Sequence, residues 1–170
     1  MNVLTLDESL LIWTVALESG YIRSSVWVDW AEKQILELDS PPFWLLEVSL
    51  ANTVEQASIL VRKHIKQTHQ ATWNSIDYND LYIGFLYLQF ERGDLKLAEL
   101  LMLAGKFADG KNYKIDCSKF FSLFDEIDNS DPIIPSLKER VEELFKPMVK
   151  LAKYYRSRLP AIATKGVQFD

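Results

Sequence analysis

Apolar residues recur at helical spacing along most of the chain, and the densest run lies at residues 79–108. The first half of this run predicts a helix with apolar side chains on every face: Leu81, Ile83, Phe85, Leu86, Leu88 and Phe90. Because a helix without a polar face has to be surrounded by protein, we expect it at the centre of the fold. After a turn at Arg92-Gly93-Asp94, the apolar residues from Leu97 to Ala108 follow the i, i+3, i+4, i+7, i+11 spacing of a helix that packs on a core.

Local signals mark the ends of further helices on both sides of this pair. Ser or Thr followed three residues later by Glu or Gln forms a capping box, which predicts helix starts near Thr5, Thr53 and Ser136. The helix that begins near Thr5 is predicted to stop at Gly20, where glycine can adopt the left-handed cap conformation. Pro147 lies inside the last predicted helix and is expected to kink or split it.

The remaining segments are predicted to be helices at residues 24–39, 41–51 and 116–127. Residues 113–115 are the only plausible extended piece, and they are too short to build a sheet. The chain is therefore predicted to be all-α, with about seven helices packed as antiparallel hairpins around the central apolar helix.

A chain of 170 residues is long enough for one well-buried core. We expect a single helical domain at residues 1–160, built as a bundle or a short α-solenoid-like array, and a C-terminal tail at residues 161–170. An internal similarity at an offset of 73 residues aligns Gly20 with Gly93 and Trp13 with Leu86. Two related helix-turn-helix units would produce such a pattern, and so would any two amphipathic hairpins aligned on their turns.

The composition indicates a compartment. A lone cysteine, Cys117, excludes an internal disulfide and fits a reducing environment. The first residues lack the basic region of a secretory signal, and no apolar run approaches the roughly 18 residues of a membrane span. We therefore expect a cytoplasmic protein that does not enter a membrane.

Few residues offer chemistry. His64 and His69 project about 140° apart around one predicted helix, so they do not easily share a metal. Cys117 lies near the start of a helix, which can lower the pKa of a thiol, but no base is predicted beside it. The acidic run at residues 125–131 lacks the alternation of a calcium-binding EF-hand loop. We expect no metal, no cofactor and no catalysis; an enzyme of unrecognised type would need these groups to converge in a pocket.

Charge is unevenly distributed within a net charge of −5. Residues 1–60 carry nine acidic residues against Arg23 and Lys33, whereas the rest of the chain sums to +2. Lys146, Lys150 and Lys153 lie on one face of the last predicted helix. With a pI of about 5.1, the chain would attract phosphate poorly at long range, so no nucleic-acid partner is expected.

The acidic half also contains Trp27, Trp30 and Trp44. Trp27 and Trp30 share a helix face and are predicted to point to the core, whereas Trp44 follows two prolines and is predicted to be partly exposed. Aromatic residues among acidic residues suit a binding site for a basic protein. The predicted partner-binding residues are Asp29, Glu32, Glu37, Asp39, Trp44, Glu47 and Glu55.

Three short segments carry a family resemblance. They are the pattern W-x-x-A-x-x-x-G-x-I that begins at Trp13, the pattern V-x-W-A at residues 28–31, and the pattern P-P-x-W-L at residues 41–45. Together they resemble small all-helical bacterial proteins of unknown function, some of which are grouped with the immunity proteins of toxin–immunity systems. The resemblance implies a non-enzymatic protein that binds and neutralises one cognate toxin. The alternative is a helical-repeat scaffold that binds a peptide or a partner helix in a groove.

Overall fold

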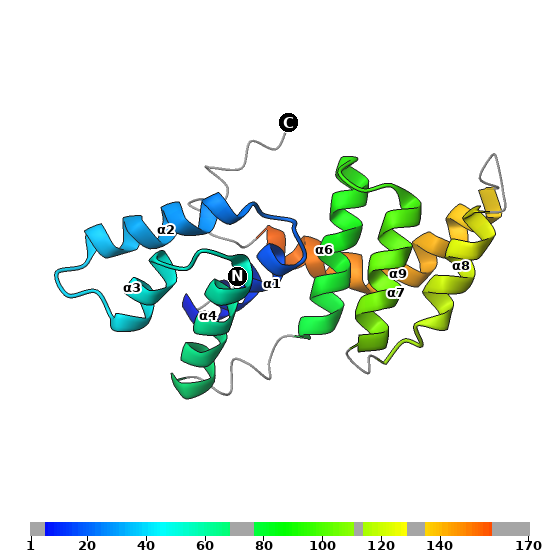
Figure 1. Cartoon of the computed structure of the whole chain (residues 1–170). Coiled ribbons are helices and arrows are strands. Elements are labelled where there is room, and N and C mark those ends of the chain that lie inside the picture. The colour runs from blue at the N-terminus through cyan, green and yellow to red at the C-terminus, as the bar shows by residue number, and fades with distance from the viewer. Residues whose placement is uncertain (1–5, 69–76, 111–113, 129–134, 158–170) are drawn as a thin grey trace. The chain divides into compact units, whose positions relative to one another are not determined.

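The computed structural model describes residues 6–68, 77–110, 114–128 and 135–157. Within these ranges every regular element is a helix, which confirms the all-α prediction. The helices, shown in Figure 1, are α1 (Leu6–Glu18), α2 (Ser24–Glu37), α3 (Phe43–Ser49), α4 (Val54–Thr68), α6 (Tyr78–Arg92), α7 (Leu97–Gly110), α8 (Ser118–Asp128) and α9 (Pro135–Arg156). Among the described residues, no helix combines the length and apolar character needed to cross a membrane.

The structure keeps α9 as one helix through Pro147, so the predicted split near Phe145 does not occur. A kink at this proline, the other expected outcome, stays a prediction. Phe145 and Met148, on either side of Pro147, are both fully buried. Their packing offsets the backbone hydrogen bond that proline cannot donate.

The contacts divide the chain into two compact units, which are described separately here. Unit 1 comprises residues 1–77 and 154–170, and unit 2 comprises residues 78–153. The expectation of one domain over residues 1–160 stays a prediction, and the predicted tail at residues 161–170 lies outside the described residues.

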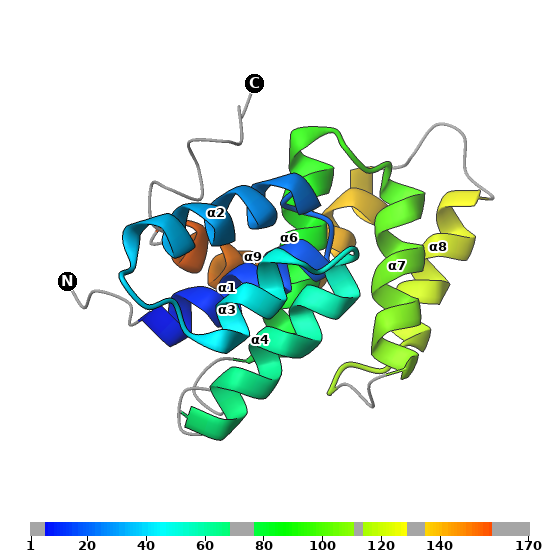
Figure 2. The ribbon, with the colours of Figure 1, turned by 60° about the vertical axis from the view of Figure 1, so that its left-hand side comes forward.

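In unit 1, α3 packs against both α2 and α4, and α4 also packs against α1 (Figure 2). Trp27 and Trp30 stack loosely together, with 5.1 Å between their ring centroids, and each lies 5.7 Å from the ring of Trp13 on α1. Trp27 is buried, as its helix face predicted, and Trp30 is half-buried. The three indoles thus hold α2 against α1.

The predicted capping box at Thr53 is present at the start of α4. The Gln56 backbone N–H donates to the Thr53 hydroxyl at 3.1 Å, and the Gln56 side-chain oxygen accepts from the Asn52 backbone N–H at the same distance. Two backbone donors that would otherwise lack a partner at the helix start are therefore satisfied.

Unit 2 is built around α6, whose residues from Asp80 to Gln89 are buried except for the half-buried Tyr82, as its sequence predicted. At Gly84 the α6 backbone touches α9: a Cβ atom there would overlap the Met148 carbonyl oxygen and stand 2.8 Å from the Cβ of Ala152. The helices can approach this closely only because residue 84 has no side chain.

Aromatic and aliphatic side chains from α6, α7, α8 and α9 fill the core of unit 2. Phe145 of α9 lies at its centre, with ring centroids 5.2 Å from Tyr87 and 5.5 Å from Phe120. Helices α7 and α8 run side by side (Figure 2). On the surface, Arg140 of α9 donates two hydrogen bonds to the Glu126 carboxylate of α8, at 2.5 and 2.9 Å.

The two glycines related by the 73-residue offset adopt similar backbone conformations. Gly20 and Gly93 have φ angles of 81° and 87°, and each follows the end of a helix. Glycine reaches this left-handed conformation at little cost, so both positions are ordinary helix C-caps. Whether the two hairpins form a true repeat stays a prediction.

Candidate functional site

Three large apolar side chains are exposed where α2 turns into α3. Leu36 has 87 % of its surface exposed, Phe43 has 73 % and Leu38 has 45 %. We call these three residues the apolar tip. The helix predicted over residues 24–39 ends two residues earlier in the structure, at Glu37. Leu38 follows the helix end with extended backbone angles (φ −108°, ψ 129°).

Acidic residues on α2 lie beside the apolar tip. Asp29, Glu32 and Leu36 follow i, i+3, i+7 spacing, so they share one face of α2, and all three are exposed. Glu37 and Asp39 are exposed at the end of the same helix. The α2 side of the tip therefore carries exposed acidic residues.

Within α2, local contacts partly neutralise Glu37. Its carboxylate accepts a hydrogen bond from Gln34 Nε2 at 3.2 Å and lies 3.8 Å from the Lys33 ammonium. All three side chains are on the surface of one helix, where such contacts contribute little to stability. They leave Glu37 able to turn toward a partner.

The third helix carries a second stripe of the same kind. Phe43, Glu47 and Leu50 follow i, i+4, i+7 spacing; Phe43 and Leu50 are exposed, and Glu47 is half-buried. Trp44 is half-buried because its ring stacks on His64 of α4, with centroids 4.2 Å apart and planes 14° apart. Glu55 is exposed in the first turn of α4. This turn follows the C-terminal end of α3, whereas the tip lies at the N-terminal end of α3.

The predicted partner-binding residues therefore fall into two groups. The structure brings Asp29, Glu32, Glu37 and Asp39 to the outer face and end of α2, beside the tip. Glu47 lies one helical turn from Phe43 on α3. Trp44 instead faces α4, and Glu55 lies in the first turn of α4. The site that the structure offers is thus centred on the apolar tip rather than on Trp44.

The lone cysteine is held in its protonated form. Its thiol Sγ lies 3.8 Å from the Asp109 carboxylate, to which it donates a weak hydrogen bond. Partial burial, followed by the negative charges of Asp109 and Asp116, raises the pKa of the Cys117 thiol. The direction is opposite to the lowering that a helix start can produce, because burial and the two nearby carboxylates all disfavour the thiolate.

The other groups considered for chemistry do not form a metal site among the described residues, where no three metal-ligating side chains gather. Part of the acidic run at residues 125–131 lies outside the described residues, and the described Glu126 is held by Arg140. His69 also lies outside them, and His64 belongs to unit 1 whereas Cys117 belongs to unit 2. The absence of catalysis stays a prediction.

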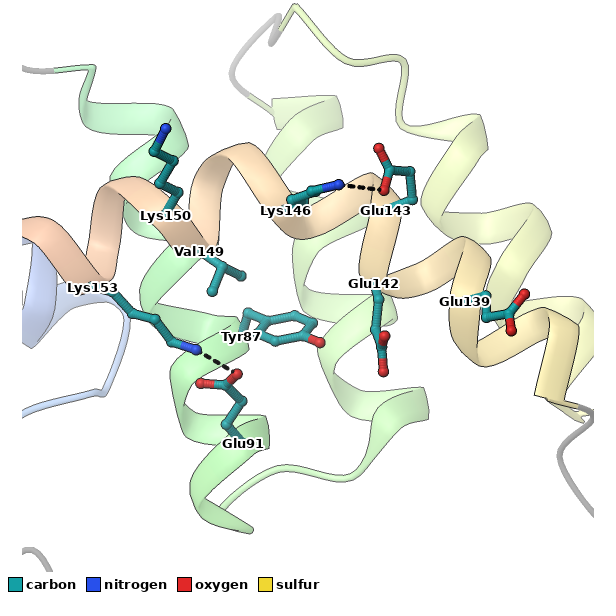
Figure 3. Close-up of a pocket in the computed structure, with 9 residues that line it drawn as sticks. All are labelled: Tyr87, Glu91, Glu139, Glu142, Glu143, Lys146, Val149, Lys150 and Lys153. Carbon is teal, nitrogen blue, oxygen red and sulfur yellow. Dashed lines mark hydrogen bonds and ion pairs between the residues drawn. The ribbon is translucent and has the colours of Figure 1, made fainter.

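A groove of about 820 Å³ lies along α9 beside α6 in unit 2 (Figure 3). Tyr87 and Val149 form its apolar floor, and charged side chains line it: Glu91, Glu139, Glu142, Glu143, Lys146, Lys150 and Lys153. Burial, followed by the charges of Glu142 and Glu91, raises the pKa of Tyr87 above 10.0. Its phenol therefore keeps its proton and can act as a hydrogen-bond donor or acceptor at the floor of the groove.

Unit 1 contains a smaller cavity of about 170 Å³ between α1, α2 and the start of α4. Its walls are mostly apolar, with Leu17, Trp27 and Val54 among them, and Asn52 and Thr53 at one side. Since no acid, base or thiol lines it, this cavity offers no catalytic group.

Two features of these sites do not follow from the sequence pattern. The pattern does not distinguish Leu36 and Phe43 from buried residues, although the adjacent Pro41-Pro42 pair indicates a tight corner that apolar neighbours cannot easily fill. It also does not link Tyr87 and Glu91 to the lysines of α9, because contacts between helices that are distant in sequence leave no local pattern.

Comparisons with models of protein families, with curated proteins and with solved structures find no match to this chain. A function can therefore be proposed only from the residues and geometry described above.

Proposed function

We propose that this chain is a non-enzymatic protein-binding module whose partner, a basic protein, docks on the apolar tip and its acidic surroundings. In the form that the family resemblance suggests, the partner is a toxin and the chain is the immunity protein that neutralises it. The main supporting observation is the exposure of Leu36 and Phe43, at 87 % and 73 %, on either side of the five-residue turn at residues 38–42, with acidic residues nearby.

The apolar side chains would supply most of the binding energy. Large exposed apolar residues surrounded by polar ones are typical of interaction sites. Fully burying a Leu or Phe side chain is worth about 1.5–3 kcal/mol. Leu36 and Phe43 therefore offer a partner several kcal/mol that the fold itself does not use.

The acidic residues would select the partner. Asp29, Glu32, Glu37 and Asp39 lie on the same helix or just after it, with Lys33 as the one cation in that stretch. A negative surface of this kind speeds association with a positive one and disfavours acidic proteins. The expected partner is therefore basic, and binding should weaken as salt increases.

The test is a pull-down with the tagged chain from extracts of its native host, at low and high salt, followed by mass spectrometry. We expect one basic protein to be retained stoichiometrically at low salt. The double variant L36S/F43S should lose it, whereas L103S, which changes an exposed leucine of α7 in unit 2, should keep it. A partner that L36S/F43S retains as well as the wild type does would remove the tip from the proposal.

A growth assay tests the toxin part separately. Expression of the captured protein should inhibit growth, co-expression of the wild-type chain should restore it, and co-expression of L36S/F43S should not. If the captured protein causes no growth inhibition, the immunity role is wrong and only the binding role remains.

A further inference from the structure

Four charged side chains form one line along the open side of the groove on α9. Glu139, Glu143, Lys146 and Lys150 follow i, i+4, i+7, i+11 spacing, which places them within a narrow arc of the helix. All four are exposed, and Figure 3 labels them along α9. At 1.5 Å per residue the line is about 16 Å long. Its first half is acidic and its second half is basic.

The two ends of this line lack partners within the described part of the chain. Neither Glu139 nor Lys150 has an ion pair there, whereas Lys146 lies 3.1 Å from Glu143. Lys153, farther along the groove, is paired with Glu91 of α6 at 2.8 Å. The unmatched charges are therefore opposite in sign and stand at opposite ends of the line.

We propose that this face of α9 binds a second copy of the chain, with the two α9 helices antiparallel. In this antiparallel arrangement Glu139 lies opposite Lys150 of the other copy, and Glu143 lies opposite Lys146 of the other copy. A two-fold axis between residues 144 and 145 generates both pairs twice, so four intermolecular ion pairs form. The surface is self-complementary, as a two-fold interface requires.

Other arrangements match the charges less well. A parallel second copy in register would place acidic residues on acidic residues and lysines on lysines, which disfavours pairing. A uniformly acidic or uniformly basic partner would match only half of the line. The antiparallel copy matches all of it, and it also sets the two helix dipoles in opposite directions.

The expected dimer is weak and salt-sensitive. Exposed ion pairs contribute at most about 1 kcal/mol each, and salt screens them. Val149 and the edge of Tyr87 are the apolar surfaces within the groove, and both are already partly or largely buried. The inference uses a surface of unit 2 and does not depend on the proposed function of the apolar tip.

Sedimentation velocity over a range of protein concentrations, at low and high salt, tests this proposal with charge-swapped variants. Wild type should show a monomer–dimer equilibrium at low salt that shifts to monomer at high salt. E139K/E143K and K146E/K150E should each be monomeric alone. In each variant all four side chains of the line carry the same charge, so two copies repel each other. Mixing the two should produce a heterodimer.

The variant with all four substitutions restores the pattern in reverse order and keeps the net charge of −5. It should dimerise as the wild type does. K106E/K119E makes the same change in net charge as K146E/K150E on exposed lysines of α7 and α8, and it should still dimerise. Circular dichroism shows whether each variant is folded.

Two results would overturn the proposal. One is a wild-type chain that stays monomeric at low salt up to high concentration, which would leave this face to a helix of another protein. The other is a dimer that persists in both E139K/E143K and K146E/K150E, which would place the dimer interface elsewhere.

Discussion

The two compact units differ in how they treat large apolar side chains. In unit 2, α6, α7, α8 and α9 enclose Phe120 and Phe145 completely, and Gly84 lets two backbones touch. In unit 1, α2 and α3 leave Leu36 and Phe43 mostly exposed at their turn, with Leu50 78 % exposed at the far end of α3. The same residue types are thus enclosed in the core of unit 2 and exposed at this turn of unit 1.

This difference has a physical origin in the connections between helices. The α2–α3 turn contains two prolines and joins a helix to one of only seven residues, so the segment is too short to cover its own apolar side chains. In unit 2 the helices α7 and α9 each present an apolar stripe, and α6 is apolar on all its faces. Folding therefore accounts for the buried apolar residues of unit 2, whereas it does not account for the exposed ones of the tip.

Replacing a phenylalanine by alanine in each unit tests this difference, and it has the largest expected effect on stability. Phe145→Ala removes a fully buried ring and should lower the free energy of unfolding by about 3–5 kcal/mol. Phe43→Ala removes a mostly exposed ring and should change it by about 0.5 kcal/mol or less. Chemical denaturation of both variants measures the difference, and equal losses would show that Phe43 belongs to the core.

Gly84→Ala tests the close packing of unit 2 with a smaller expected effect. Alanine is normally the better helix former, but here its methyl group would overlap the Met148 carbonyl oxygen, so the helices must move apart. We expect a loss of roughly 1–3 kcal/mol in the free energy of unfolding.

Gly110→Ala is the matched control for Gly84→Ala. It places the same methyl group where no atom lies within 4 Å, so stability should stay the same or rise slightly. Thermal unfolding followed by circular dichroism compares the two variants. If Gly84→Ala were as stable as Gly110→Ala, the close contact between α6 and α9 would be wrong.

The pH dependence of Tyr87 has the smallest expected effect. Because its pKa is raised in the folded state, the phenol contributes stability that is fully present below pH 10.0 and is lost as the pH rises through the higher folded value. Absorbance titration of phenolate in the wild type and in Y87F should identify one tyrosine that ionises late.

Glu142→Gln provides the control for the cause of this shift. Removing one of the two nearby negative charges should move the late ionisation toward lower pH, while burial keeps it above the ordinary value. If Tyr87 ionised together with exposed tyrosines, its position at the floor of the groove would be wrong.

The fold class was predictable because helices leave local patterns. The burial of α6 follows from apolar residues on all its faces, and the Thr53 cap follows from a four-residue motif. The continuity of α9 through Pro147 was not predictable, since it depends on how Phe145 and Met148 pack against other helices. The local sequence determines helix propensity. The packing around Pro147 depends instead on side chains that only folding brings together.

The acidic residues of the candidate site could be predicted from the sequence, whereas the exposed apolar residues at its centre could not. The acidic residues of α2 are countable in the sequence, and their exposure on one face follows from their spacing. Leu36, Leu38 and Phe43 have the same apolar character as core residues, so no pattern separates them from residues that become buried. The raised pKa of Cys117 likewise depends on the burial of its thiol and on Asp109, eight residues away, being brought next to it.

The most direct test of the central claim is the affinity of the purified partner for three forms of the chain, measured by isothermal titration calorimetry. L36S/F43S should weaken binding by about 3 kcal/mol or more, which is roughly a hundredfold, because two apolar side chains can no longer be buried. L103S should bind within about twofold of the wild type, since surface changes outside an interface have small effects. Equal affinities for the wild type and L36S/F43S would contradict the assignment of the apolar tip as the binding surface.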